Sequence, residues 1–269
     1  MNFKSIPSQF EYLSWPEVEN IAKDKRSTVI WPFGAVEQHG PHLPLATDSI
    51  FVDEIICEVL KLLPSDMPLK KIPTQYIGFS PEHKGFDGTI SLSSNLITSM
   101  IKEVGAQLSF MGFKRLILIN AHGGQISLLN TAARELRSFA PKLSIFPCFL
   151  WSGVDGLSDL LSKKEIENGL HASLAETSLM MALKPELVGD ERPNNVFEGQ
   201  IPDGWSLEGS APTAWLTEDL SSSGVIGDSR DANEELGNNL KSLLINHWYK
   251  LIKNLMESDW PNSKINKRQ

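Results

Sequence analysis

The chain has 269 residues, and its 33 Asp and Glu outnumber its 25 Lys and Arg, which gives a formal net charge of −8. This acidic balance argues against nucleic acid as a partner, and no apolar run approaches the ~18 residues needed to span a bilayer. The first ten residues lack the pattern of a secretory signal, and two cysteines are too few for a disulfide framework or a Cys-based zinc site. We therefore expect a globular cytoplasmic protein with no membrane or nucleic-acid partner.

Short apolar runs alternate with longer helical patterns along the first half of the chain. Residues 28–31 are predicted as a buried strand. Thr47 is predicted to cap a helix whose apolar residues recur at helical spacing up to Pro64. A second strand is predicted over 70–77, and a second helix over 94–110.

The second half of the chain continues the alternation of strand and helix. Residues 115–119 are predicted as a strand, and the four residues after Arg115 are apolar, as is typical of a central parallel strand. A helix, a strand and a last long helix are then predicted over 125–139, 143–150 and 233–256. This order predicts βαβ units and an α/β fold with a mostly parallel sheet.

The domain organisation is expected to be simple. We expect a single domain over residues 1–269, because no repeat or low-complexity segment divides the chain. Residues 190–232 are rich in Gly, Pro, Ser and Asn and are predicted as long ordered loops, which suit a lid or an oligomer contact. The polar tail over 260–269 is predicted to be frayed.

Potential metal ligands follow the first predicted strand, in residues 34–48. Glu37 and His39 are one residue apart, so in extended backbone their side chains point to the same side. Carboxylate and imidazole together suit zinc and other first-row divalent ions. Asp48, at a helix start, can offer two oxygens to two ions, although such an Asp taken alone is more often a helix cap.

Two further segments carry residues of the same kinds. His122 follows the central strand, and Gly123 and Gly124 let the backbone come close to a metal or substrate. His171 and Glu176 are five residues apart, so one can bind metal while the other faces substrate. In parallel sheets, ligands bind beyond the carboxyl ends of the strands. Spacing alone leaves a metal site and ordinary structural roles equally open.

The motifs taken together resemble the creatininase, or creatinine amidohydrolase, family. The similarity is carried by PFGAVEQHGPHLPLATD (32–48), NAHGGQ (120–125) and HASLAETS (171–178), with weaker matches at 80–83, 88–92 and 224–228. Gly124 departs from creatinine hydrolases, which have a metal-binding Glu at this position. We therefore expect a branch other than creatinine hydrolase itself.

The resemblance implies a three-layer α/β/α fold, assembly as a homo-hexamer, and two divalent metal ions, commonly zinc or manganese, at the sheet edge. One ion would be held by Glu37, Asp48 and His122. The other would be held by His39, Asp48 and Glu176, so that Asp48 bridges the pair and Glu176 serves both binding and catalysis. A water or hydroxide between the ions would be the nucleophile.

The resemblance also suggests a proton donor and substrate contacts. His171 matches the family's histidine near the leaving nitrogen and is the candidate donor or shuttle. The candidate substrate contacts are His83, Trp151, Gly123 and Gly124, with a loop hydrogen bond as the other role open to His83. Residues 159–170 contain no aromatic side chain, which disfavours creatinine as the substrate.

These inferences predict a dinuclear amidohydrolase that uses a metal-bridging hydroxide to cleave a non-peptide C–N bond in a small cyclic amide or formamide. One alternative is a non-catalytic, metal-stabilised assembly or binding protein with the same fold. A peptidase-type branch of the family is another, and a metal-dependent sugar isomerase or lyase is a third. The expected partners are a small-molecule substrate and further copies of the chain.

Overall fold

A four-stranded sheet organises the structure, which is a computed structural model that describes residues 8–197, 199 and 201–261. The strands are β1 (Thr28–Phe33), β2 (Leu69–Lys71), β3 (Arg115–Asn120) and β4 (Ser144–Phe149). Their order is β2-β1-β3-β4, and every neighbouring pair is parallel. The predicted parallel sheet is therefore confirmed.

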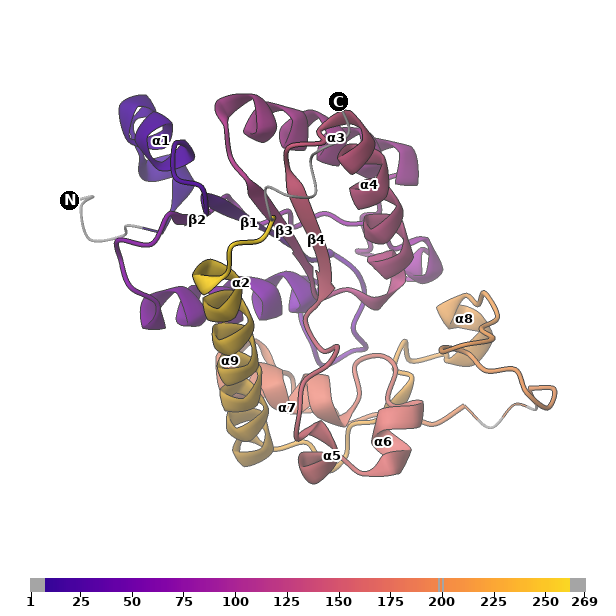
Figure 1. Cartoon of the computed structure of the whole chain (residues 1–269). Helices are drawn as coiled ribbons and strands as arrows, with labels where there is room; N and C mark the ends of the chain where they lie inside the picture. The colour runs from indigo at the N-terminus through magenta and orange to yellow at the C-terminus, as the bar shows by residue number, and fades with distance from the viewer. Residues whose placement is uncertain (1–7, 198, 200, 262–269) are drawn as a thin grey trace.

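Helices cover both faces of this sheet and give the expected three layers (Figure 1). One face carries α3 (Ser94–Met111) and α4 (Ile126–Phe139). The other face carries α2 (Thr47–Leu62), α7 (Leu174–Leu183) and α9 (Glu234–Glu257).

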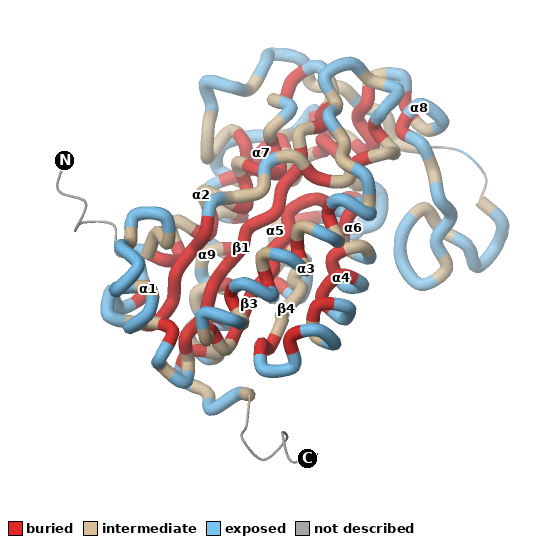
Figure 2. The backbone as a smooth tube through the Cα atoms, turned by 90° about the horizontal axis from the view of Figure 1, so that it is seen from above, coloured by how far each residue is buried: buried red, intermediate tan, exposed pale blue. Residues whose placement is uncertain are grey.

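The sequence of β3 explains why the sheet is buried on both faces (Figure 2). Successive side chains of a strand point to opposite faces. Leu116 and Leu118 join the core beneath α3 and α4, whereas Ile117 and Ile119 join the core beneath α2 and α9. All four side chains are at most 3% exposed. The strand is therefore fixed between two apolar layers, and only its ends reach polar surroundings.

Two boundaries differ from the predictions. The second strand ends at Lys71 instead of extending to residue 77. The Ile72 N–H still donates to the carbonyl of Ile30, but Pro32, the next residue of β1 that would donate to this segment, has no N–H. Hydrogen bonding to β1 returns at Gln75, whose N–H donates to the carbonyl of Pro32. Thr47 is the first residue of α2 and not its cap, which is Ala46, and the Thr47 hydroxyl donates to the carbonyl of Pro44.

Several short elements were not predicted. They are α1 (Trp15–Ala22), α5 (Leu157–Leu160), α6 (Lys163–Asn168) and the 3-10 turns η2 (Phe10–Tyr12), η3 (Pro81–His83), η4 (Gly123–Gln125) and η5 (Pro185–Leu187). Most of them have too few residues to show a helical period.

The predicted loop region, 190–232, contains mainly irregular backbone. Its short elements are β5 (Asn194–Asn195), α8 (Thr217–Leu220) and β6 (Gly227–Asp228), and β5 pairs antiparallel with β6. The segment around α8 stands out from the rest of the molecule (Figure 1). Most of the predicted frayed tail lies outside the described residues, which end at 261. None of the helices that the structure describes is long and apolar enough to cross a membrane.

Candidate metal centre

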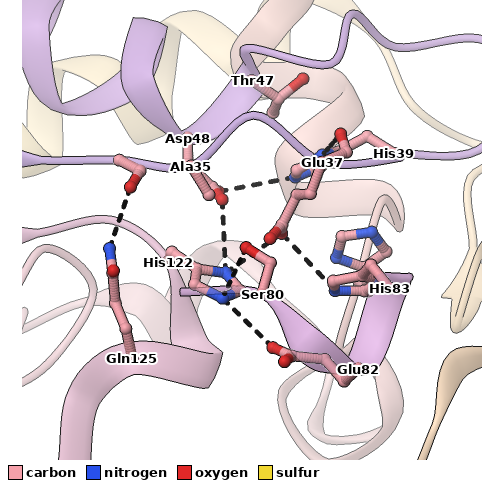
Figure 3. A network of polar contacts seen from close by, with 12 residues as sticks. Ala35, Glu37, His39, Thr47, Asp48, Ser80, Glu82, His83, His122 and Gln125 are labelled. Atoms are coloured by element: carbon pink, nitrogen blue, oxygen red, sulfur yellow. Dashed lines mark hydrogen bonds and ion pairs between the residues drawn. The ribbon is translucent and has the colours of Figure 1, made fainter. Parts of the chain in front are cut away.

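Three acidic and imidazole side chains meet beyond the carboxyl ends of β1 and β3 (Figure 3). Glu37 follows β1, Asp48 lies in the first turn of α2, and His122 follows β3. Their exposed fractions are 0%, 2% and 3%. Because β1 and β3 are adjacent and parallel, their loops leave the sheet at the same edge. The topology therefore brings residues 85 positions apart into contact, as the sequence predicted.

Asp48 lies between two imidazole rings. Its Oδ1 is 3.5 Å from Nε2 of His39, and its Oδ2 is 3.4 Å from Nδ1 of His122. The Nδ1 atom of His122 is also 3.0 Å from Oε1 of Glu37. One carboxylate thus presents one oxygen to each of two imidazole nitrogens. A carboxylate that bridges two metal ions requires this arrangement.

Several buried polar atoms of this cluster have no hydrogen-bond partner. They are both carboxylate oxygens of Glu37, Oδ2 of Asp48 and Nε2 of His39. Buried polar groups in folded proteins are almost always hydrogen-bonded, so such a concentration requires an explanation. Candidate ligand atoms of Glu37, His39 and Asp48 lie within 4.8 Å of one another. Divalent cations would satisfy these atoms, and the donor set suits zinc or manganese.

His171 and Glu176 reach the same cluster from the start of α7. Candidate ligand atoms of His39, His171 and Glu176 lie within 4.8 Å of one another. Nε2 of His171 donates to the carbonyl oxygen of Gln38 over 2.7 Å, and Oε2 of Glu176 accepts the N–H of Ala172 over 2.6 Å. Ala172 has a positive φ of 51°, so the loop turns sharply between these two side chains.

The pKa values of the two candidate ligand histidines, His39 and His122, rise although both rings are buried. Burial by itself lowers the pKa of His39, but the charge and hydrogen bond of Asp48, together with the charges of Glu176 and Glu37, raise this pKa to about 9. Burial likewise opposes protonation of His122, but Glu37 and Asp48 hold its pKa well above the usual value. The cluster therefore attracts positive charge strongly, which also favours a cation.

The pKa of Glu176 rises and that of His171 falls, and both shifts favour the neutral form. Burial, reinforced by the charge of Asp48, raises the pKa of Glu176 to about 7 although His39 opposes it. Burial and the neighbouring rings of His83 and His39 hold the pKa of His171 well below the usual value. His171 is therefore neutral at neutral pH. Because its Nε2 carries the proton given to Gln38, its Nδ1 has a free lone pair.

His83 belongs to the cluster and is not confined to a loop contact. Its ring stacks on that of His171 with centroids 4.2 Å apart, and its Nε2 lies 3.5 Å from Oε1 of Glu37. On the other side, its Nδ1 lies 2.9 Å from Nε2 of Gln38 and 2.7 Å from the hydroxyl of Thr217. The ring is therefore fixed between two polar partners and the acidic centre.

The other predicted substrate contacts are placed differently. Trp151 packs edge-on against Phe51, with centroids 6.2 Å apart, in the core beneath α2. A β carbon on Gly123 would meet nothing within 4 Å, whereas one on Gly124 would collide with the carboxylate of Glu82. Their roles as substrate contacts stay predictions.

Residues from the predicted loop region also reach the centre. Thr217 lies at the start of α8, and the ring of Trp215 meets that of His83 edge-on, with centroids 6.3 Å apart. Their sequence surroundings show no period or motif that would have assigned them to the site. Glu82 was visible only as part of the short stretch 80–83.

Comparison with protein families gives one match over most of the chain. Residues 11–252 match the family model described as "Creatininase: Creatinine amidohydrolase". The match includes every candidate ligand.

Individual relatives agree with this match. The chain is 28% identical over 232 residues to a mycofactocin precursor peptide peptidase of Mycobacterium tuberculosis, covering 81% of each protein. It is 28% identical over 196 residues to creatinine amidohydrolase of Pseudomonas putida, covering 67% of this chain and 73% of that one.

Solved structures share the fold. One described as "Creatininase Mn" has a TM-score of 0.74 at 21% identity, covering 93% of this chain and 98% of the other. A mutant creatininase described as "Zn-Zn type" has a TM-score of 0.72 at 22% identity over the same shares.

Proposed function

Because the chain belongs to the creatininase family, in a branch other than creatinine hydrolase itself, we propose that it is an amidohydrolase that works with two divalent metal ions. The observation that carries this proposal is the position of Asp48. Its two oxygens face one imidazole each, beside carboxylate oxygens that have no hydrogen bond.

The donors divide into two sets that share Asp48. Glu37, Asp48 and His122 would hold one ion, since Nδ1 of His122 lies within 3.4 Å of an oxygen of each acid. His39, Asp48 and Glu176 would hold the other. The raised pKa of Glu176 fits this role, because the ionised form of a buried acid beside another acid is stabilised when a cation binds.

The chemistry follows from the residues that surround the ions. When bound, the ions would lower the pKa of water and polarise a substrate carbonyl. His171, neutral with a lone pair on Nδ1, would accept the proton released as water attacks the amide carbon. It would then pass that proton to the leaving nitrogen, which cannot depart as an anion. The hydrogen bond to the Gln38 carbonyl would hold the ring in the required tautomer during both transfers.

Two classes of amide are candidates for the substrate. The sequence motifs predict a small cyclic amide or a formamide, whereas four of the curated relatives are peptidases of a precursor peptide. Both classes present a carbonyl carbon and a leaving nitrogen to the same machinery. The outer segment around α8 supplies Trp215 beside His83, so a substrate that contacts His83 would lie close to this indole.

Metal reconstitution combined with a substrate panel tests the proposal. Protein stripped with a chelator would be reloaded with Zn²⁺ or Mn²⁺, and bound metal would be counted by inductively coupled plasma mass spectrometry. Cyclic amides, formamides and short peptides would then be assayed for release of amine or carboxylate. We expect two ions per chain and hydrolysis that requires them. A single ion with no turnover of any class would instead indicate the non-catalytic assembly.

A further inference from the structure

Glu82 lies behind His122, on the side away from the other acids (Figure 3). Its Oε1 is 3.1 Å from Nε2 of His122, while Nδ1 of the same ring faces Glu37 and Asp48. The side chain of Glu82 is 14% exposed, so this contact is largely shielded from water. The two nitrogens of one imidazole thus meet acids on opposite edges.

The position of Glu82 depends on the lack of a side chain at Gly124. A β carbon there would collide with the Glu82 carboxylate and would lie 2.7 Å from Nε2 of His122. The neighbouring Gly123 has open space at the corresponding position. Gly124 therefore leaves the room that the carboxylate of Glu82 occupies.

The backbone of Glu82 is also held in place. Glu82 lies within η3, and its carbonyl oxygen accepts a hydrogen bond from the Thr217 hydroxyl over 3.0 Å. This bond links η3 to the start of α8 across 135 residues of chain. The carboxylate therefore approaches His122 from an anchored turn.

We propose that Glu82 is a positioning residue for His122. By accepting the proton on Nε2, it fixes the tautomer in which the lone pair of Nδ1 faces Glu37 and Asp48, and its negative charge makes that lone pair a stronger donor. This inference rests on the proposed function, because it concerns the metal affinity of the same centre. Histidine ligands commonly donate their second N–H in this way, and loss of the partner typically lowers metal affinity ~10–100-fold.

Two uncharged acceptors also lie near Nε2 of His122, so the effect of the negative charge of Glu82 can be told apart from the effect of a hydrogen bond alone. The carbonyl oxygen of Phe79 is 3.1 Å from Nε2, and the hydroxyl oxygen of Ser80 is 3.4 Å away. Either can receive the proton when Glu82 is removed, so the ring does not lose every partner. The contribution specific to Glu82 is a directed and negatively charged acceptor, and its loss should weaken binding without unfolding the protein.

Calorimetric titration of the stripped full-length protein with Zn²⁺ alone, in the presence of a competing chelator, tests the inference. We expect Glu82→Ala to weaken binding at one of the two sites ~10–100-fold. Glu82→Gln, which keeps the shape and a hydrogen-bond acceptor, should recover part of that loss. Gly124→Ala should behave like Glu82→Ala, because it displaces the same carboxylate. Asp87→Ala, which removes an exposed acid from the same loop, is the matched control and should bind like the wild type.

Nitrogen NMR of His122 supplies a readout that a purely structural role would not move. In zinc-loaded wild type we expect a protonated Nε2 hydrogen-bonded to an acid, and a shift of that signal in Glu82→Ala. Unchanged zinc affinity in Glu82→Ala, with wild type binding two ions, overturns this inference and leaves the proposed function intact. A wild-type protein that binds neither Zn²⁺ nor Mn²⁺ overturns both.

Discussion

The two ends of β3 both bury charged side chains, but they treat them in opposite ways. At its start, Arg115 is fully buried and donates to three carbonyl oxygens, those of Leu255, Ser258 and Trp260, over 2.6–2.8 Å. At its other end, His122 meets Glu37 and Asp48, whose oxygens include three without a hydrogen bond.

The charge of Arg115 is hydrogen-bonded within the fold, whereas the charges around His122 leave acceptor atoms open to a ligand. The guanidinium of Arg115 is satisfied by the end of α9, so its site is complete without any ligand. The carboxylates around His122 have buried oxygens without a hydrogen bond, which lowers the stability of the fold unless a cation binds. Substitutions near Arg115 should therefore change the free energy of unfolding, and substitutions near His122 should change metal content and turnover.

The largest effect is expected from Asp48→Ala at the carboxyl end. Because this carboxylate faces both imidazoles, its loss should remove both ions and reduce turnover by at least ~10³-fold, the scale of losing metal activation of water. Metal counting and a hydrolysis assay check this. Glu58→Ala, ten residues further along α2, is the matched control and should keep both ions. Retention of two ions by Asp48→Ala would exclude the bridging assignment.

His171→Ala should lower turnover while leaving metal content unchanged. Positioned acid–base groups typically contribute 10²–10⁴-fold, so a loss of about that size is expected. Glu176→Ala is the comparison, since it should lose an ion. The same metal counting and assay apply. The ligand assignment is wrong if His171→Ala abolishes metal binding and Glu176→Ala does not.

Arg115→Met, at the other end of the strand, should lower stability and leave metal content and turnover unchanged. The change removes the guanidinium donor from three part-buried carbonyl oxygens, of which only that of Leu255 keeps other donors among the described residues, the N–H and hydroxyl of Ser258. We expect a loss on the order of 3 kcal/mol in the free energy of unfolding. Urea denaturation measures this loss. Metal stoichiometry and kcat of the folded fraction should match the wild type. A loss of bound metal without a loss of stability would contradict the division of roles between the two ends.

The smallest effect concerns Glu165, a buried acid that accepts two hydrogen bonds. Burial raises its pKa, although hydrogen bonds from the Ser173 hydroxyl and the Ala175 N–H oppose the shift. A raised acid pKa stabilises the folded state at low pH, and that contribution is lost as the pH rises from the ordinary value of 4.5 through the folded pKa.

Glu165→Gln should therefore flatten the pH dependence of stability in that window. The difference in the free energy of unfolding between wild type and variant should change by less than ~1 kcal/mol between pH 4 and pH 8, measured by urea denaturation. Glu167→Gln, an exposed acid in the same short helix, is the control. Wild-type stability that rises relative to Glu165→Gln across this window would contradict the assigned direction.

The sequence predicted the sheet and most of the centre for one physical reason. Parallel strands that are apolar throughout must be buried, and their carboxyl ends must share an edge. Glu37, His39 and His122 follow such strands directly. Their meeting with Asp48 was therefore predictable before the structure was known.

Other parts of the centre depended on geometry that the sequence does not encode locally. The contact between Glu82 and His122 needs the turn at η3, the bond from Thr217 and the open space at Gly124. The early end of β2 follows from the missing N–H of Pro32, whose place beside β2 is set by the register of the two strands. Trp151 was a candidate only through the resemblance to the family, and its packing on Phe51 is a tertiary contact.

The left-handed turn at Ala172 has an energetic consequence for the whole molecule. A residue with a β carbon in this conformation raises the energy of the folded chain by ~1–2 kcal/mol. Paired hydrogen bonds between His171 and Ile226, together with the Glu176 carboxylate on the Ala172 amide, keep the turn in place. The loop that carries His171, the proposed proton shuttle, is therefore strained, and this strain lowers the stability of the fold while the turn holds the orientation of that side chain.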